Sequence, residues 1–402
     1  MKGENNQTGA SSTTNSKTLV SRRSVLKSSG GALVAPAVFV GNSKTGSGSG
    51  ISSPGDTIEL PRKFNGDQVT EWMTVPKAWY EQKEHVSDLL PEFGKEYGHI
   101  DGVKCAGKRI SKEEFGGKQG FDIYVGVSSS DLQYKIPGEF EGQQVHTEIL
   151  NPQDQGYDPY KCTPGSCSNT DPCYYGCDYD KMPGGVVIQV GGTSTVRVTK
   201  DDIDYMMTAG HVVANDRDPC DGDNIGHGVL QYSRDLGDVE YMADVLDVAL
   251  VSNKNQNNID LTGDVADEDL GDVYIWDHYS KSGLDDLIER ETTVYHTGTA
   301  TGTRSGVLKG SEHHDYDGFD ACKSFNHSGI RGKIWGAAGD SGAPIYTRDD
   351  GTGVGTLCGM RNQGDNDTGF DECNCQDIEE NIYGASAYSI KDKWSSITFG
   401  YQ

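Results

Sequence analysis

The sequence predicts a mostly β protein in which a small α/β unit precedes the β region. Residues 204–208 and 246–251 are short apolar runs with the length of buried strands. Glycine-bearing tight turns such as 336–342 interrupt these runs. One earlier stretch, residues 76–97, instead carries apolar side chains at helical spacing, and strand signals follow it at 102–103, 122–127 and 136–145. Helix and strands together predict the α/β unit.

The composition describes a folded chain with a strongly acidic surface. Acidic residues number 61 against 35 basic ones, which gives a net charge of −26. The 20 tyrosines and 5 tryptophans argue against a disordered chain. A negative surface repels nucleic acid and anionic membranes, so we expect neither as a partner. It resembles the surfaces of proteins from extreme halophiles, and we expect stability and activity to depend on molar salt.

Three short strings supply a base, an orienting acid and a nucleophile. TAGH ends at His211, DVALV starts at Asp247, and GDSGAP surrounds Ser341. A serine hydroxyl attacks a carbonyl efficiently when an imidazole takes its proton and a carboxylate orients that imidazole. TAGH alone is equally compatible with a buried histidine after a strand, and DVALV alone fits many strands. The three strings in this order are what indicate acyl-transfer chemistry.

The order His, Asp, Ser resembles that of chymotrypsin-like proteases. TAGH and the stretch 294–308 are similar to the streptogrisin and α-lytic type, over about residues 184–402. The resemblance implies two six-stranded antiparallel β-barrels with the active site between them. It also implies an oxyanion hole formed by the N–H groups of Gly339 and Ser341.

The resemblance also suggests a substrate pocket. Trp335 stands six residues before Ser341, where a preference for basic side chains requires an acid, and no acid lies between Gly332 and Gly339. A preference for Arg or Lys is therefore not expected. Cys358, Gly359 and Met360 belong to the run expected to form one pocket wall, with Met360 making the pocket shallow and apolar.

His296 occupies the place where the resembled enzymes carry an arginine that pairs with the buried acid before the nucleophile. That acid here is Asp340. We expect His296 to contact Asp340 and its protonation to tune the oxyanion loop. The simpler interpretation is a histidine hydrogen-bonded within a core.

The N-terminal region contains signals for export and a separate unit. Ser21 to Lys27 include Arg22-Arg23 and precede a mildly apolar run, as in a twin-arginine signal peptide. We therefore expect a signal and leader at 1–45, a Gly/Ser linker at 46–56 and the α/β unit at 57–155. A Cys-rich loop at 156–183 and a protease domain at 184–402 would follow. The α/β unit is either a pro-domain or a permanent accessory domain.

Ten cysteines fit an exported, oxidised protein. Cys162, Cys167, Cys173 and Cys177 lie close together, and their spacing favours disulfides over a zinc site. Cys373 and Cys375 are expected to bridge to Cys322, Cys358 or this loop. His313-His314-Asp315 is interpreted as a solvated charge cluster in a loop, in preference to a metal site.

The sequence thus predicts a secreted serine endopeptidase that needs no cofactor or metal and takes a polypeptide substrate. His211 would be the general base, Asp247 its orienter and Ser341 the nucleophile. A serine esterase or narrow-specificity processing protease remains an alternative, as does an inactive binding module on a protease scaffold. The oligomeric state is left open.

Overall fold

A computed structural model describes twelve stretches of the chain. These are residues 55–150, 178–189, 191–214, 226, 228–231, 233–253, 259–267, 269–315, 329–336, 339–349, 352–364 and 381–400. Residues from Ile51 to Gln402 belong to one compact unit. The expected signal peptide and the four crowded cysteines lie outside the described residues.

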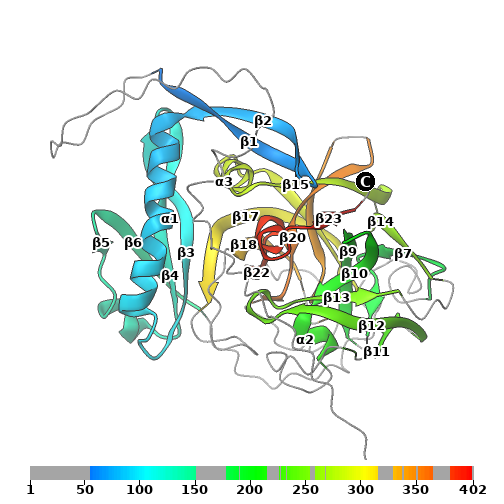
Figure 1. Cartoon of the computed structure of the whole chain (residues 1–402). Coiled ribbons are helices and arrows are strands. Elements are labelled where there is room, and N and C mark those ends of the chain that lie inside the picture. Colours follow the sequence, from blue (N-terminus) through cyan, green and yellow to red (C-terminus); the bar gives the residue numbers. More distant parts are fainter. Residues whose placement is uncertain are drawn as a thin grey trace, which may run out of the picture. The chain divides into compact units, whose positions relative to one another are not determined.

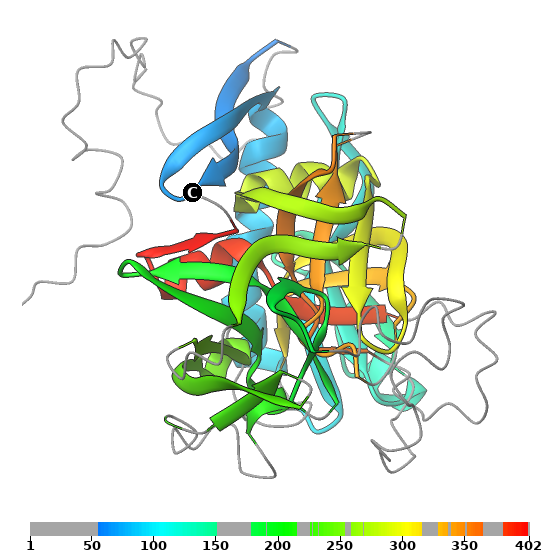
Figure 2. The ribbon, with the colours of Figure 1, turned by 90° about the vertical axis from the view of Figure 1, so that its right-hand side faces the viewer.

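The N-terminal segment begins with a hairpin of β1 (Thr57–Asn65) and β2 (Gln68–Pro76). Gly66 makes the turn at φ +57°, a conformation that glycine adopts without strain. β1 also pairs with β15 (Gly271–Tyr279), far along the chain. The hairpin, drawn in blue in Figure 2, therefore extends a sheet of the C-terminal region. A methyl group on Gly66 in its turn would lie 3.5 Å from Thr398 Oγ1.

Helix α1 (Lys77–Tyr97) confirms the helix expected at 76–97. Its apolar side chains recur every three or four residues and face β3 (Val103–Phe115) and β4 (Lys118–Val127), along which the helix runs in Figure 1. Short strands β5 (Glu139–Phe140) and β6 (Gln143–Ile149) complete this part, and β4 and β6 run parallel. A 3₁₀ turn, Ser130–Tyr134, precedes β5.

The larger sheet joins the N-terminal strands to those of the C-terminal region. Its main path runs β2-β1-β15-β20-β19-β16-β17-β3-β4-β6-β5. The C-terminal members not yet bounded are β7 (Lys181–Gly184), β14 (Asp260–Asp267), β16 (Thr293–Gly298), β17 (Gly302–Asp315), β18 (Gly329–Ile334), β19 (Pro344–Arg348), β20 (Val354–Met360), β21 (Gln363–Gly364) and β22 (Asn381–Ala385). The long strand β17 pairs with β16 and β18 and then with β3 at His314 and Asp315. The prediction of a loop at 313–315 is therefore wrong, because these residues form the end of strand β17.

The smaller sheet contains the first two motifs. Its members are β8 (Val187–Ile188), β9 (Gly192–Lys200), β10 (Ile203–Ala209), β11 (Gly228–Gln231), β12 (Arg234–Ala243), β13 (Val248–Ser252) and β23 (Ile397–Phe399). Short helices are α2 (Gly210–Val213), α3 (Lys281–Glu289), α4 (Ala387–Lys393) and the 3₁₀ turn Asp244–Leu246. The expected buried strands at 204–208 and 246–251 are β10 and β13.

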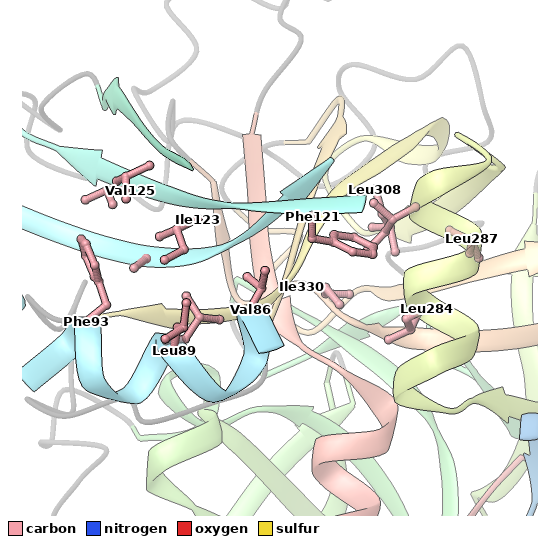
Figure 3. Packing of buried hydrophobic residues seen from close by; sticks show 14 of the residues in the cluster. Val86, Leu89, Phe93, Phe121, Ile123, Val125, Leu284, Leu287, Leu308 and Ile330 are labelled. Carbon is pink, nitrogen blue, oxygen red and sulfur yellow. The ribbon is translucent and has the colours of Figure 1, made fainter. Parts of the chain in front are cut away.

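One hydrophobic cluster spans the N-terminal segment and the larger sheet. Figure 3 shows members from two helices and three strands, namely Val86, Leu89 and Phe93 on α1, Leu284 and Leu287 on α3, Phe121, Ile123 and Val125 on β4, Leu308 on β17 and Ile330 on β18. Burying one such side chain contributes about 1.5–3 kcal/mol. The shared cluster therefore stabilises both parts together.

The mostly β fold class is confirmed. The His and Asp motifs lie in the smaller sheet, and the Ser motif lies between strands of the larger, largely antiparallel sheet. The larger sheet exceeds the six strands expected for a barrel because strands from residues 57–149 extend it at both ends. Within the described stretches, no helix combines the length and the apolar character needed to cross a bilayer.

Candidate active site

Strand pairing in the smaller sheet brings His211 and Asp247 together. β10 pairs with β13 so that Ala209 lies opposite Val248. His211 follows the end of β10 in the first turn of α2, and Asp247 immediately precedes β13. Residues distant in sequence therefore become neighbours at one edge of this sheet.

Asp247 holds His211 through both the imidazole and the backbone. His211 Nδ1 lies 2.7 Å from Asp247 Oδ2, and the His211 N–H donates to Asp247 Oδ1 at 2.8 Å. Asp247 has φ +48°, in the left-handed region that is uncommon for residues other than glycine. Gly210 leaves room for this contact, because a methyl group there would lie 2.9 Å from Asp247 Oδ1. Glycine at this position of TAGH therefore avoids a steric clash with the Asp247 carboxylate.

The turn that carries Ser341 requires glycine on both sides. Gly339 has φ +99° and Gly342 has φ +94°. A methyl group on Gly342 would lie 2.0 Å from the carbonyl oxygen of Thr193. Neither the Gly339 N–H nor the Ser341 N–H donates to an acceptor among the described residues. Their role as an oxyanion hole stays a prediction.

Threonines of β9 connect this turn to the smaller sheet. The Thr193 N–H donates to the Ser341 carbonyl at 2.8 Å, and Thr193 Oγ1 donates to the Gly339 carbonyl at 2.8 Å. Thr195 Oγ1 donates to the Gly342 carbonyl at 2.6 Å. The turn lies between β18 and β19 of the larger sheet, so these bonds cross from one sheet to the other.

Asn362 joins the acid to the nucleophile, and sequence reasoning missed it. The side-chain Nδ2 of Asn362 donates to Asp247 Oδ2 at 3.0 Å and to the Leu246 carbonyl at 2.9 Å. The backbone carbonyl of Asn362 accepts a hydrogen bond from Ser341 Oγ at 3.0 Å. His211, Asp247, Asn362 and Ser341 thus form one connected group. The available signal was a polar residue two positions after the apolar run that ends at Met360.

The structure contains the expected contact between His296 and Asp340. His296 Nε2 lies 3.5 Å from Asp340 Oδ2, and both side chains are fully buried. Closer bonds to the carboxylate come from the N–H groups of Ala300 and Thr301, at 2.9 and 3.2 Å, and from Thr301 Oγ1 at 2.7 Å. The turn between β16 and β17 therefore donates most of the hydrogen bonds that the Asp340 carboxylate accepts.

Both groups of that pair have lowered pKa values. Burial lowers the pKa of His296, and the charges of Arg361 and Arg304 add to this effect against that of Asp340. Burial alone would raise the pKa of Asp340, but His296, Arg361 and Thr301 outweigh it and lower this pKa to about 2. At neutral pH the acid is ionised and the imidazole is neutral. Tuning by His296 protonation stays a prediction.

The residues expected at the pocket occupy two different environments. Trp335 is half-buried, with the Arg304 guanidinium carbon 4.4 Å from its ring centroid. Cys358 and Met360 are fully buried on β20 in hydrophobic clusters, and Gly359 between them is buried as well. Their role in a pocket stays a prediction.

One part of the disulfide prediction is wrong. Cys358 is a free buried thiol, and burial raises its pKa. The bridge considered from Cys373 or Cys375 to Cys358 is therefore not formed. Cys322, Cys373 and Cys375 lie outside the described residues.

Comparison with known proteins gives structural similarity alone. No family model and no curated protein sequence matches the chain. Among solved structures, Thermobifida fusca protease A has 18% identity and a TM-score of 0.38, covering 55% of this chain and 100% of its own. Cellulomonas bogoriensis chymotrypsin has 15% identity and a TM-score of 0.38, covering 55% and 98%. A glutamic acid-specific serine protease with a histidine triad in substrate binding has 16% identity and a TM-score of 0.39, covering 55% and 100%.

Proposed function

We propose that this protein is a serine endopeptidase in which Ser341 is the nucleophile. The observation that carries the proposal is the bond between His211 Nδ1 and Asp247 Oδ2, at 2.7 Å, in a group that Asn362 connects to Ser341 Oγ. A carboxylate on Nδ1 leaves Nε2 as the basic nitrogen and stabilises the imidazolium. The His211 side chain is 34% exposed, so a substrate can reach the imidazole.

The proposed reaction proceeds through an acyl-enzyme. Ser341 Oγ attacks the peptide carbonyl carbon while His211 Nε2 takes the hydroxyl proton, and the carbonyl oxygen becomes an oxyanion. The N–H groups of Gly339 and Ser341 bind that oxyanion, and loss of one such donor typically costs about 10²–10³ in rate. The tetrahedral intermediate then collapses, and His211 gives its proton to the leaving amine. Water attacks the resulting ester in the same way and regenerates Ser341.

The hydroxyl of Ser341 must turn toward His211 for this reaction. In the structure it donates to the Asn362 carbonyl at 3.0 Å. Rotation about one side-chain bond is fast compared with typical turnover, so this alternative partner does not obstruct catalysis. Asn362 would meanwhile keep Asp247 oriented by donating to its Oδ2 at 3.0 Å.

The substrate would be a polypeptide without a basic residue at the cleavage site. Trp335 stands where an acid would be needed to hold Arg or Lys, and Arg304 lies on its ring. We further propose export through the twin-arginine signal at Arg22-Arg23 and a requirement for molar salt, on the composition and motif given above.

Hydrolysis of casein in molar KCl tests the proposal. The parent protein should release peptides, and Ser341→Ala and His211→Ala variants should lose at least about 10³-fold in rate. Hydrolysis of a simple aryl ester without casein cleavage would instead favour the esterase or narrow processing enzyme. A folded parent that cleaves neither substrate would favour the binding module.

A further inference from the structure

We propose that Thr193 is a positioning residue whose hydroxyl fixes the turn that presents Ser341 and the amides assigned to the oxyanion hole. The inference rests on the proposed function, because the turn has this role only if Ser341 is the nucleophile. Thr193 is the second residue of β9 and belongs to none of the motifs found in the sequence. Its side chain has no solvent exposure, so it acts on the reaction through its neighbours and not by touching the substrate.

Two hydrogen bonds from Thr193 hold peptide groups on either side of the one that carries the Ser341 N–H. Thr193 Oγ1 donates to the Gly339 carbonyl at 2.8 Å, and the Thr193 N–H donates to the Ser341 carbonyl at 2.8 Å. The peptide group between them contains the Asp340 carbonyl, which accepts from the Ala343 N–H at 2.9 Å. Because each peptide group is planar, fixing a carbonyl also fixes the direction of the N–H in the same group. These bonds therefore set the direction of the Ser341 N–H.

The Thr193 hydroxyl has a partner for its proton and partners for its oxygen. A threonine hydroxyl donates one hydrogen bond and accepts two, and a carbonyl only accepts, so the proton goes to the Gly339 carbonyl. The Thr299 N–H donates to Thr193 Oγ1 at 3.0 Å. Thr299 Oγ1 lies 2.5 Å from Thr193 Oγ1 and 3.1 Å from the Gly192 carbonyl, so its proton is shared between them. Removing the Thr193 hydroxyl would leave the Gly339 carbonyl and the Thr299 N–H without this partner.

Thr193 is itself held by the strand that leads to the base. Thr208, the first residue of TAGH, lies on β10 and donates from Oγ1 to the Thr193 carbonyl at 2.8 Å. β10 ends at Ala209, and His211 follows in α2. Hydrogen bonds thus run from the strand of the base through Thr193 to the turn of the nucleophile.

The same hydroxyl also reaches the turn that binds Asp340. Thr299 is followed by Ala300 and Thr301, whose N–H groups donate to the Asp340 carboxylate at 2.9 and 3.2 Å. The Thr193 hydroxyl therefore lies where β9, the turn between β16 and β17, and the nucleophile turn meet. Its loss should displace the amides of the nucleophile turn while leaving the substrate-binding surface in place.

The size of the effect follows from the bonds that remain. The Thr193 N–H still donates to the Ser341 carbonyl when the side chain is changed, so the turn is loosened and not lost. Complete loss of one oxyanion donor typically costs about 10²–10³ in rate, and a displaced donor should cost less. We therefore expect Thr193→Val, which has nearly the same shape without the hydroxyl, to lose about 10- to 10²-fold in kcat with KM nearly unchanged.

The experiment measures kcat and KM for peptide hydrolysis in molar KCl, per active site counted by complete fluorophosphonate labelling. Counting active sites removes the effect of any unfolded fraction. Thr193→Ser keeps the hydroxyl and should recover most of the kcat that Thr193→Ala loses. The matched control is Thr199→Val on the same strand, because the Thr199 hydroxyl donates to Asp204 at 2.8 Å, away from the turn. It should leave kcat and KM unchanged.

A peptide aldehyde gives a readout that a merely structural role would not change. Ser341 Oγ adds to the aldehyde carbon while His211 takes the hydroxyl proton, and the aldehyde oxygen becomes an oxyanion facing the same amides. Because such a compound resembles the transition state, its Ki should rise in Thr193→Val by about the factor by which kcat/KM falls.

Thr193→Val with the kcat and aldehyde Ki of the parent would overturn the inference, as would a loss that lies in KM alone. If Thr193→Val does not fold, Thr193→Ser and Thr193→Ala make the same comparison, because neither carries the γ-methyl group and only serine has the hydroxyl. Equal kcat values for these two would also overturn the inference. A parent that neither takes the label nor cleaves peptides would refute the proposed function itself, so the two failures are distinguishable.

Discussion

A buried ion cluster between the N-terminal segment and the C-terminal region gives the most quantitative prediction. Lys108 on β3 is fully buried and lies 2.9 Å from Asp285 Oδ2 on α3 and 2.8 Å from Glu312 Oε2 on β17. Lys83 on α1 adds a second buried cation, 3.3 Å from Asp285. Desolvation opposes the charge of Lys108, but Asp285 and Glu312 outweigh it, so the pKa of Lys108 is raised. The lysine is therefore charged.

Lys108→Met should cost about 3–5 kcal/mol in the free energy of unfolding, the usual effect of removing one partner of a buried ion pair. Asp285 keeps Lys83 and the Ser311 hydroxyl, and Glu312 keeps Lys281 at 2.7 Å. These remaining partners favour the lower end of the range. The cost arises because two acids then share fewer buried cations in a water-poor environment.

Urea unfolding at fixed KCl concentration, followed by tryptophan fluorescence, measures this free energy. The matched control is Lys309→Met, which removes an exposed ion pair with Glu291 and should change stability by no more than the experimental error. A Lys108→Met protein as stable as the Lys309→Met control would refute the reasoning.

Three further predictions concern single residues. Asn362→Ala should lower kcat by about 10- to 10²-fold with KM nearly unchanged, since its amide bonds a charged carboxylate; an unchanged kcat would contradict this. Gly342→Ala should lower the urea midpoint strongly, because its methyl group would lie 2.0 Å from a backbone oxygen; a parent-like midpoint would count against the turn geometry. Burial lowers the pKa of His278 from 6.5 to about 4, so the unfolded chain binds the proton more tightly and Tm should fall as pH drops from 6.5 to 4. His278→Phe, which retains ring packing against Phe64 and Phe399, should flatten this fall, and an equally steep Tm profile would disprove its cause.

Local sequence patterns predicted the elements that depend on local physics. The helical spacing of Trp79, Val86 and Leu89-Leu90 located α1, and apolar runs located β10 and β13. The motif residues His211 and Asp247 were brought together as expected because they flank paired strands. The contact of His296 with Asp340 was expected from the resemblance to proteases that carry an arginine in this place, and the two side chains do lie 3.5 Å apart.

Features that depend on distant pairing were not visible in the sequence. The backbone register that joins β1 to β15 and β17 to β3 makes residues 57–149 part of the larger sheet, and no local pattern reports such a register. Asn362 contacts Leu246, Asp247 and Ser341, which are distant from it in the chain, and a single polar residue after a strand carries no distinctive signal. Cys358 was expected in a bridge because spacing alone does not reveal burial inside a strand.

Covalent labelling by a fluorophosphonate, with the modified peptide identified by mass spectrometry, tests the central claim most directly. The proposed arrangement of His211, Asp247 and Ser341 makes one hydroxyl far more nucleophilic than every other serine in the chain. Labelling should occur on Ser341 in the parent and fall at least about 10³-fold in rate in folded His211→Ala. Labelling spread over several serines, or labelling of Ser341 that is equally fast without His211, would contradict the account.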